Sequence, residues 1–189
     1  MQQAVQAGAG MMAVILGMAA PDVQQLCDEA SQGEVVAPAN FNGAGQIVIA
    51  GAKAAVLRAM ALARERGAKR VLELSVSAPF HCALMMPASD GLKRVLADVA
   101  VQPFAVGVIT NVEAAVNQDH ARVKPLLVEQ AVRPVRWEES VQRLAELGCE
   151  RALEIGPGKV LSGLIRRISP KLQVGNIESP QDLKKVVVN

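Results

Sequence analysis

The sequence predicts a mixed α/β (α+β) fold, in which short strands and amphipathic helices follow one another along the chain. Apolar runs of strand length recur at residues 12–17, 46–50 and 70–76. The segments between them place apolar residues three or four positions apart, which is the spacing of one helix face. Hydrophobic residues make up 51% of the 189 residues, which is enough for the core of one compact unit or two small ones.

The first part of the chain has its elements in an order that indicates one arrangement. Turn and cap residues such as Pro21 and Gly67 separate the apolar segments. The predicted elements are a strand at 12–17, a helix after Pro21, strands at 34–37 and 46–50, a helix at 52–66 and a strand at 70–76. This order is the split βαβ, or ferredoxin-like, arrangement. We therefore expect residues 11–76 to form a four-stranded antiparallel sheet with two helices on one face.

Strands and helices continue to alternate beyond Ser77, where we place a domain boundary. The predicted elements are an amphipathic helix with Leu92, Val95, Leu96 and Val99, a fully buried strand at 105–109, a helix beginning near Pro125, a helix with Trp137, Val141, Leu144 and Ala145, a strand at 152–155 and a helix at 160–168. The expected domains are therefore residues 10–77 and residues 78–189.

His81 is the first candidate for chemistry, because it lies just past a predicted strand. Pro79 ends the strand and fixes the direction in which the chain leaves it. A loop carried by a rigid sheet holds a side chain in place and leaves it accessible. Imidazole exchanges a proton near neutral pH, but a lone histidine also serves simply as a packing group. The residues around His81 have to decide between these two interpretations.

Four segments of the chain together carry a resemblance to a known family. They are Ala39-Asn-Phe-Asn-Gly-Ala-Gly-Gln-Ile-Val-Ile-Ala-Gly51, Ser77-Ala-Pro-Phe-His-Cys-Ala-Leu-Met-Met-Pro87, Arg133-Pro-Val-Arg-Trp137 and Glu154-Ile-Gly-Pro-Gly-Lys-Val-Leu161. In this order and at this spacing they resemble the C-terminal part of a malonyl-CoA:acyl-carrier-protein transacylase of bacterial fatty-acid synthesis. The resemblance implies a ferredoxin-like small domain at residues 10–77. It implies the C-terminal portion of an α/β-hydrolase-like acyltransferase domain at residues 78–189.

The resemblance also implies a chemistry, which is acyl transfer through a serine ester. His81 stands where the family has its histidine base, which takes the serine proton and then protonates the leaving thiolate of coenzyme A. Arg136 lies in the segment whose main chain orients that histidine in the family. The family's nucleophile lies in a Gly-His-Ser-x-Gly segment, and no Gly-x-Ser-x-Gly occurs in this sequence. We therefore expect a truncated chain that carries the base without the nucleophile and is inactive alone.

Three amide side chains are candidates for substrate binding. Asn40, Asn42 and Gln46 lie around a predicted loop, where their amides can hydrogen-bond a thioester or the amides of pantetheine. The other interpretation is turn chemistry, because Asn and Gly cluster where the backbone takes a positive φ. Both interpretations stay open from the sequence.

The composition argues against several other classes of function. Aromatic residues make up only 2% of the chain and the net charge is +2, which predicts no nucleic-acid partner. Cys27, Cys82 and Cys149 are widely separated and include no Cys-x-x-Cys, which predicts neither a disulfide framework nor a metal site. This cysteine usage fits a reduced, cytoplasmic location. The apolar segment at 10–20 is too short to span a membrane.

Charge is distributed unevenly along the chain. The first 52 residues contain no Lys or Arg and carry a net charge of −4, so the remainder carries +6. Arg166, Arg167 and Lys171 form a basic cluster in the C-terminal part. Such a cluster fits an acidic carrier protein or the phosphates of coenzyme A. It also fits a solvated helix face with no partner.

Two hypotheses for the function follow from these observations. The first is a part of an acyltransferase that moves malonyl from coenzyme A to acyl carrier protein, with its nucleophile outside this chain. Its expected partners are malonyl-CoA, acyl carrier protein and a separate N-terminal fragment, and no cofactor is needed because the coenzyme A thioester is a substrate. The alternative is a non-catalytic module that docks acyl carrier protein. In a truncated chain we expect exposed strand edges and apolar helix faces within residues 78–189.

Overall fold

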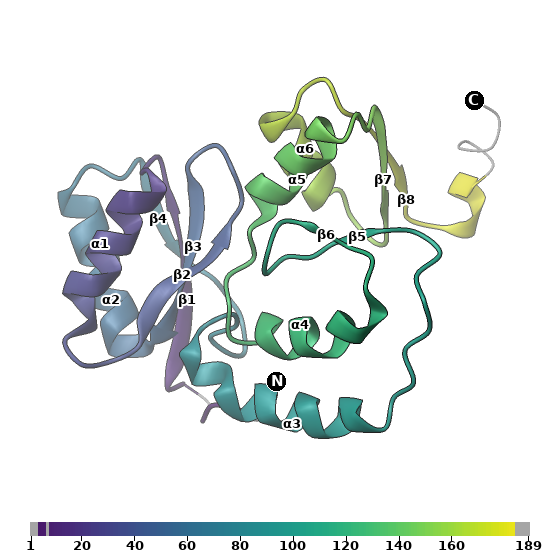
Figure 1. Cartoon of the computed structure of the whole chain (residues 1–189). Helices are drawn as coiled ribbons and strands as arrows, with labels where there is room; N and C mark the ends of the chain where they lie inside the picture. The colour runs from purple at the N-terminus through teal and green to yellow at the C-terminus, as the bar shows by residue number, and fades with distance from the viewer. Residues whose placement is uncertain (1–3, 7, 184–189) are drawn as a thin grey trace. The chain divides into compact units, whose positions relative to one another are not determined.

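The structure is a computed structural model that describes residues 4–6 and 8–183. Its contacts divide the chain into two compact units, of which the first ends at Trp137 and the second begins at Glu138. Figure 1 shows the elements of both units. This division by contacts differs from the expected boundary after residue 77, which referred to the domains of the family. That boundary stays a prediction.

The first unit opens with a sheet and two helices. These elements are β1 (Gly10–Leu16), α1 (Ala20–Ser31), β2 (Val36–Phe41), β3 (Gln46–Ala52), α2 (Lys53–Glu65) and β4 (Arg70–Glu73). The strands form one sheet in the order β2-β3-β1-β4, and every neighbouring pair is antiparallel. The predicted four-stranded antiparallel sheet is therefore confirmed. One boundary differs in a way that matters, because β2 runs on to Phe41 and so places Asn40 in a strand rather than in a loop.

The two faces of this sheet have different neighbours, because side chains alternate along a strand. Ala13 and Ile15 of β1 pack under both helices, against a cluster that includes Leu26 of α1 and Met60 of α2. Figure 1 shows α1 and α2 side by side along this face, as predicted. The opposite face carries Met12 and Val14, which cluster with residues that include Cys82. The second face therefore fixes the backbone next to His81.

The rest of the first unit consists of short elements around two helices. They are η1 (Ala83–Met85), α3 (Met86–Ala97), β5 (Val108–Ile109), β6 (Val116–Asn117), η2 (His120–Arg122) and α4 (Val123–Gln130). The helices α3 and α4 are joined where the Ser89 hydroxyl donates to the carbonyl of Val128 at 2.9 Å. A second link is the Lys124 ammonium, which donates to the carbonyl of Ala97 at 2.8 Å.

The prediction of a fully buried strand at 105–109 is wrong. Only Val108 and Ile109 form a strand there, paired with β6, and Val108 is 45% exposed. An apolar run becomes a buried strand only when other layers cover both of its faces, and the described residues provide no such layers at this place. The predicted helix face around residue 95 is likewise only partly buried, since Val95 in α3 is 69% exposed.

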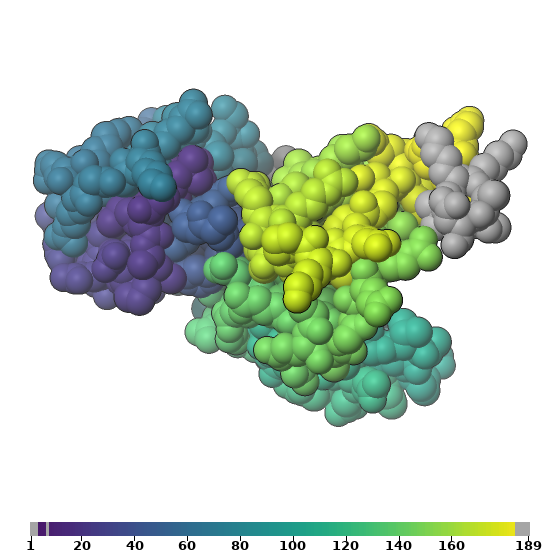
Figure 2. All heavy atoms as spheres, turned by 90° about the horizontal axis from the view of Figure 1, so that it is seen from above, coloured from purple at the N-terminus to yellow at the C-terminus, as the bar shows by residue number. Residues whose placement is uncertain are grey.

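The second unit is built on a pair of parallel strands. Its elements are α5 (Trp137–Glu146), which begins at the last residue of the first unit, β7 (Arg151–Ile155), α6 (Val160–Ile168), β8 (Gln173–Ile177) and η3 (Pro180–Asp182). β7 and β8 pair in parallel, and the helix α6 makes the crossover that parallel strands require. The predicted strand at 152–155 and helix at 160–168 are confirmed. In Figure 2 this unit is the part coloured from green to yellow. Among the described residues of the chain, no helix is both long and apolar enough to cross a membrane.

Candidate active site

The turn that carries His81 is held against the sheet from two sides. Pro79 and Cys82 are fully or almost fully buried on either side of it. The Cys82 thiol donates to the carbonyl of Pro79, with 3.1 Å between sulfur and oxygen. Gly10 leaves room for the proline, because a side chain at residue 10 would overlap the Pro79 ring. These contacts fix both ends of the turn and leave His81 between them.

His81 itself has an unusual backbone conformation, with φ of +60°. This is the left-handed region, which costs a residue other than glycine about 1–2 kcal/mol. Histidine is among the residue types enriched there. Such strain persists only when the surrounding structure imposes it, and it is concentrated at functional sites. Packing of the turn is what imposes it here.

The ring of His81 is oriented by the end of a helix. Its Nδ1 lies 3.0 Å from the backbone oxygen of Gln130, the last residue of α4. A carbonyl oxygen only accepts, so Nδ1 carries the proton and Nε2 keeps a free lone pair. That is the tautomer in which a histidine can take a proton from a nucleophile through Nε2.

The carbonyl of Gln130 is free to do this because α4 ends there, and Pro134 could not pair with it in a longer helix either. In a continuing helix it would accept from the N–H of residue 134, four positions on, and proline has no N–H. Sequence reasoning missed Gln130, although a proline four residues after a predicted helix residue is a signal of an unpaired carbonyl. The residue that contacts Nδ1 therefore lies three positions before the predicted segment 133–137.

Arg136, the predicted histidine-orienting residue, contacts the loop that follows β5. Its backbone N–H donates to the carbonyl of Asn111 at 3.1 Å, and its guanidinium donates to the carbonyl of Glu113 at 3.1 Å. Arg136 thus fastens the loop that follows β5. Nearby, Val135 pairs with the end of β2, where Phe41 donates to its carbonyl at 2.9 Å. The segment 133–137 therefore contacts β2 and the loop at 111–113. The backbone contact with Nδ1 of His81, which was expected from this segment, comes from Gln130.

Two of the three predicted substrate-binding amides share a sheet face with the histidine turn. Asn40 is paired with Val48 and Gln46 with Leu16 in the strand ladders. Residues directly opposite each other in such a ladder point to the same face, and Val48 and Leu16 belong to the cluster around Cys82. The side chains of Asn40 and Gln46 therefore lie on that face as well.

Asn42 belongs to the hairpin turn between β2 and β3. Its backbone N–H donates to the carbonyl of Gln46 at 3.0 Å, and the turn passes through Gly43, Ala44 and Gly45 with positive φ. Turn chemistry, the second of the two interpretations of this segment, thus accounts for the backbone at residues 42–45.

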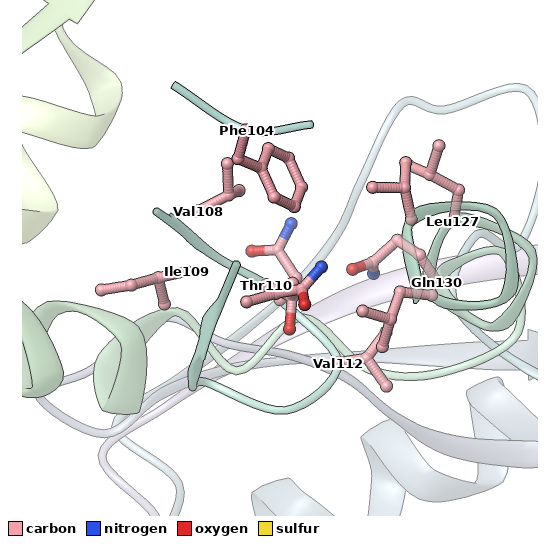
Figure 3. A pocket seen from close by; sticks show the side chains of 11 residues that line it. Phe104, Val108, Ile109, Thr110, Val112, Leu127 and Gln130 are labelled. Carbon is pink, nitrogen blue, oxygen red and sulfur yellow. The ribbon is translucent and has the colours of Figure 1, made fainter. Parts of the chain in front are cut away.

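A cavity of about 330 Å³ lies next to Gln130 in the first unit. Figure 3 shows its lining, which comes from α4 and from the segment around β5. Most of the lining is apolar, and the polar groups among it include Thr110, Asn111 and Gln130. The Thr110 hydroxyl is buried without a hydrogen-bond partner. The cavity wall thus includes the residue that holds His81.

Cys82 is the nucleophilic side chain nearest to His81 in the sequence, and its surroundings make it unreactive. It is only 2% exposed, and burial raises the pKa of its thiol. A thiol that stays protonated and shielded is a poor nucleophile. Within residues 4–6 and 8–183, no group of three or more His, Cys, Asp or Glu side chains is placed to hold a metal ion. Of the two side chains, the partly exposed imidazole of His81 is thus the one that is accessible.

In sequence and in fold the chain is similar to malonyltransferases. It is 46% identical to the malonyl CoA-acyl carrier protein transacylase of Haemophilus influenzae over 173 residues, which are 92% of this chain and 55% of that protein. The crystal structure of an acyl carrier protein S-malonyltransferase from Vibrio cholerae matches with a TM-score of 0.95 at 46% identity, covering 98% of this chain and 61% of that one. A type II PKS acyl-carrier protein in complex with its malonyl-transacylase contains a chain that matches with a TM-score of 0.94 at 41% identity, covering 100% and 61%. No protein-family model matches the chain.

These matches confirm the resemblance found in the sequence. The chain is a homologue of the malonyl-CoA:acyl-carrier-protein transacylases and has their acyltransferase fold. It spans a little over half of the length of the curated relatives that it matches, for example 55% of the Haemophilus influenzae protein.

Proposed function

We propose that this chain is the histidine-bearing part of an enzyme that moves malonyl from coenzyme A to acyl carrier protein. The observation that carries the proposal is the hydrogen bond from Nδ1 of His81 to the Gln130 carbonyl at 3.0 Å. It leaves Nε2 as the basic atom of an imidazole that stands on a strained, well-packed turn. The names of the relatives support malonyl-CoA and acyl carrier protein as the two substrates.

In the proposed reaction His81 moves one proton back and forth. Nε2 takes the proton of a serine hydroxyl while the serine oxygen attacks the carbonyl carbon of the malonyl thioester. The carbon–sulfur bond then breaks, and the imidazolium gives its proton to the departing thiolate of coenzyme A. In the second half, the thiol of the carrier protein gives its proton to Nε2 while its sulfur attacks the carbonyl carbon of the serine ester. The carbon–oxygen bond to the serine then breaks, and the imidazolium returns the proton to the serine oxygen. No cofactor is consumed in either half.

The serine is proposed to lie outside these 189 residues. No Gly-x-Ser-x-Gly occurs in the sequence, and Cys82 is unsuited to replace it. Each unit has apolar surface that a further segment can cover, such as Val106 in the first unit, 74% exposed, and Ile155 in the second, 76% exposed. β7 and β8 are joined to no further strand of the described chain, although parallel strands are normally found in larger, covered sheets. We propose that a separate N-terminal fragment supplies the serine and covers these surfaces.

Asn40 and Gln46 are proposed to hydrogen-bond the acyl thioester or the pantetheine amides. The support is their place on the sheet face that carries the histidine turn. Asn42 belongs to the same proposed set, and its backbone supports the turn between the two strands. We propose no substrate contact for Arg136, whose guanidinium donates to backbone carbonyls of the loop after β5.

The basic cluster at the end of α6 is proposed to attract the acidic carrier protein. Arg166 and Arg167 lie in the last turn of α6 and are exposed, as is Lys171 just beyond it. A solved complex of a related malonyl-transacylase with its acyl-carrier protein supports a carrier as partner. The proposed location is the cytoplasm, which is supported by three free cysteines, Cys27, Cys82 and Cys149.

A complementation experiment tests this function. The chain is mixed with the part of a transacylase that carries the Gly-His-Ser-x-Gly segment, and transfer of radiolabelled malonyl to carrier protein is measured. We expect no transfer by the chain alone and transfer by the mixture, with the label passing through the serine of the added part. A mixture that forms a stable complex with carrier protein but transfers nothing would favour the non-catalytic docking module. Label attached to a residue of this chain would show that the nucleophile is not outside it.

A further inference from the structure

The turn that joins β2 and β3 (Figure 1) contains an asparagine followed directly by a glycine, Asn42-Gly43. Asn42 is the only asparagine of the sequence that precedes a glycine. Because glycine has no Cβ, no side chain of residue 43 shields its backbone nitrogen. This nitrogen is next in the chain to the Asn42 carboxamide, and a bond from it to the carboxamide carbon closes a five-membered ring.

The structure leaves both groups free to react. The turn is closed by the N–H of Asn42, which donates to the carbonyl of Gln46 at 3.0 Å, and by the N–H of Gln46, which donates to the carbonyl of Gly43 at 3.0 Å. Between these two bonds, the N–H of Gly43 and the carboxamide of Asn42 have no hydrogen-bond partner among the described residues. No hydrogen bond therefore has to break before the nitrogen attacks.

The other described asparagines precede residues that have side chains, and two of them are fixed in strands. Asn40 lies in β2, and the N–H that follows it, that of Phe41, donates to a backbone carbonyl at 2.9 Å. Asn176 lies in β8, and its carboxamide donates to Glu154 at 3.0 Å. The remaining two are Asn111, which precedes Val112, and Asn117, which precedes Gln118.

We propose that Asn42 is a modification site, at which the chain converts its own asparagine to aspartate and isoaspartate. The Gly43 nitrogen bonds to the side-chain carbonyl carbon, the carbon–nitrogen bond of the carboxamide breaks, and the proton of the attacking nitrogen leaves with the departing group as ammonia. Water then opens the resulting succinimide ring. Addition at the side-chain carbonyl gives aspartate, and addition at the backbone carbonyl gives isoaspartate. One water is consumed for each ammonia released, and nothing is oxidised or reduced.

The product changes the turn in charge and in shape. Aspartate is ionised at neutral pH, so the conversion adds a negative charge to the first 52 residues, which already carry a net charge of −4. Isoaspartate also adds one carbon to the backbone path. The turn is tied to the residue after β1, because the N–H of Gly17 donates to the carbonyl of Gly45 at 2.9 Å, and a longer path shifts this contact.

The added charge has a consequence for binding that rests on the proposed function, whereas the chemistry of the turn does not. Coenzyme A carries phosphates and the proposed carrier protein is acidic, so both are repelled by a further carboxylate near the proposed substrate-binding amides. The unmodified chain should therefore bind these partners better than the converted one.

The test is the mass of the peptide that contains Asn42, followed over time in the folded full chain at pH 8 and at pH 5 in water enriched in ¹⁸O. We expect the peptide to gain the mass of an acid in place of an amide, with one ¹⁸O, in two forms that chromatography separates. The conversion should be faster at pH 8, because the attacking nitrogen has to lose its proton. Asn42 should convert at least about tenfold faster than Asn111, since the approach of two neighbouring groups controls an intramolecular rate to this extent or more.

Asn42→Gln is the matched control, because its longer side chain would have to close a larger ring. Its amide should stay intact under the same conditions. Three results would overturn the proposal: an Asn42 peptide that keeps its amide while Asn111 loses it, conversion to aspartate alone, which would indicate direct hydrolysis without a ring, and loss of the amide in Asn42→Gln at the wild-type rate. If Asn42→Gln does not fold, the comparison of Asn42 with Asn111 in the wild type decides.

Asn42→Asp separates this proposal from the proposed function. In the complemented enzyme it should raise KM for malonyl-CoA about two- to fivefold, the range for one additional surface charge. Conversion of Asn42 in a chain whose mixture never transfers malonyl would support the modification site and contradict the function. Transfer by a mixture in which Asn42 stays intact throughout would do the reverse.

Discussion

At the scale of single residues, the reactivity of the cysteines follows from where the backbone places them. Cys27 belongs to α1, lies in the core of the first unit and is 0% exposed, and burial raises the pKa of its thiol to about 12. Burial also raises the pKa of the Cys82 thiol, which donates to Pro79 in the turn before α3. Cys149 is free and exposed in the second unit. The two buried cysteines therefore differ strongly from Cys149 in solvent access.

We predict that iodoacetamide at pH 8 alkylates Cys149 at least tenfold faster than Cys27 or Cys82, because the thiolate is the nucleophile and both buried thiols stay protonated. Peptide mass spectrometry over a time course measures the three rates. In urea the three cysteines should react alike, which controls for intrinsic reactivity. Alkylation of Cys82 as fast as Cys149 in the folded chain would show that the histidine turn is not packed as described.

At the scale of elements, the helix–sheet packing of the first unit accounts for most of its core. Leu26 in α1 is completely buried against the sheet, whereas Leu57 in α2 is 46% exposed. Leu26→Ala should therefore lower the free energy of unfolding of this unit by about 2–5 kcal/mol, from lost burial and the cavity that remains. Leu57→Ala, the matched control, should change it by less than about 0.5 kcal/mol. Urea denaturation followed by circular dichroism measures both, and equal effects would contradict the orientation of the helices.

In the second unit, the start of helix α6 depends on one carboxylate, that of Glu154 near the end of β7. It accepts from the backbone N–H of Leu161 at 3.0 Å and of Ser162 at 2.8 Å, in the first turn of α6. It also accepts from the Ser162 hydroxyl at 2.6 Å and from Asn176 of β8 at 3.0 Å. The first turn of a helix has unpaired N–H groups and a partial positive charge, so an ionised carboxylate there is favourable. Glu154 therefore ties β7, α6 and β8 together.

The pH dependence of the second unit should follow from this contact. The hydrogen bond from the Ser162 hydroxyl, together with the backbone N–H groups, lowers the pKa of Glu154 from its ordinary 4.5. A lowered pKa means stabilisation that is present above the ordinary value and is lost as the pH falls through the lowered one. Glu154→Gln should therefore reduce the melting temperature at pH 7 and have a much smaller effect at pH 3. Glu146→Gln at the exposed end of α5 is the control, and an equal response of both variants across this pH range would contradict the role of Glu154.

Sequence patterns predicted elements well where periodicity and burial coincide. The strands β1, β3 and β7 and the helices α2, α5 and α6 follow alternation or helical spacing that their own packing preserves. The pattern failed at 105–109, because an apolar run shows which residues can be buried but not whether other elements cover them. It also missed β8, whose Gly175 and Asn176 are residue types depleted in strands. The partner of His81 was missed because a carbonyl has no signature of its own, although Pro134, which has no N–H, excludes a helical partner for that carbonyl.

At the scale of the whole molecule, the chain contains an oriented histidine and exposed apolar surfaces. The first unit positions His81 through Gln130, and the second presents a two-stranded parallel sheet with an exposed apolar face that includes Leu153 and Ile155. Solved malonyltransferases match it over nearly its full length and are themselves longer, so that 98% of this chain corresponds to 61% of the Vibrio cholerae chain. The account as a whole therefore depends on His81 acting as a base once a serine is supplied.

The most direct test of that claim is malonyl transfer by the complemented enzyme with Ala at position 81. His81→Ala should lower the rate by about 10²–10⁴-fold, which is the typical contribution of a general base. His120→Ala should leave the rate nearly unchanged, since this second histidine is exposed in η2 and remote from the turn in sequence. A complemented His81→Ala enzyme as active as the unsubstituted one would contradict the account, because the strained histidine would then be structural and the chain a docking module.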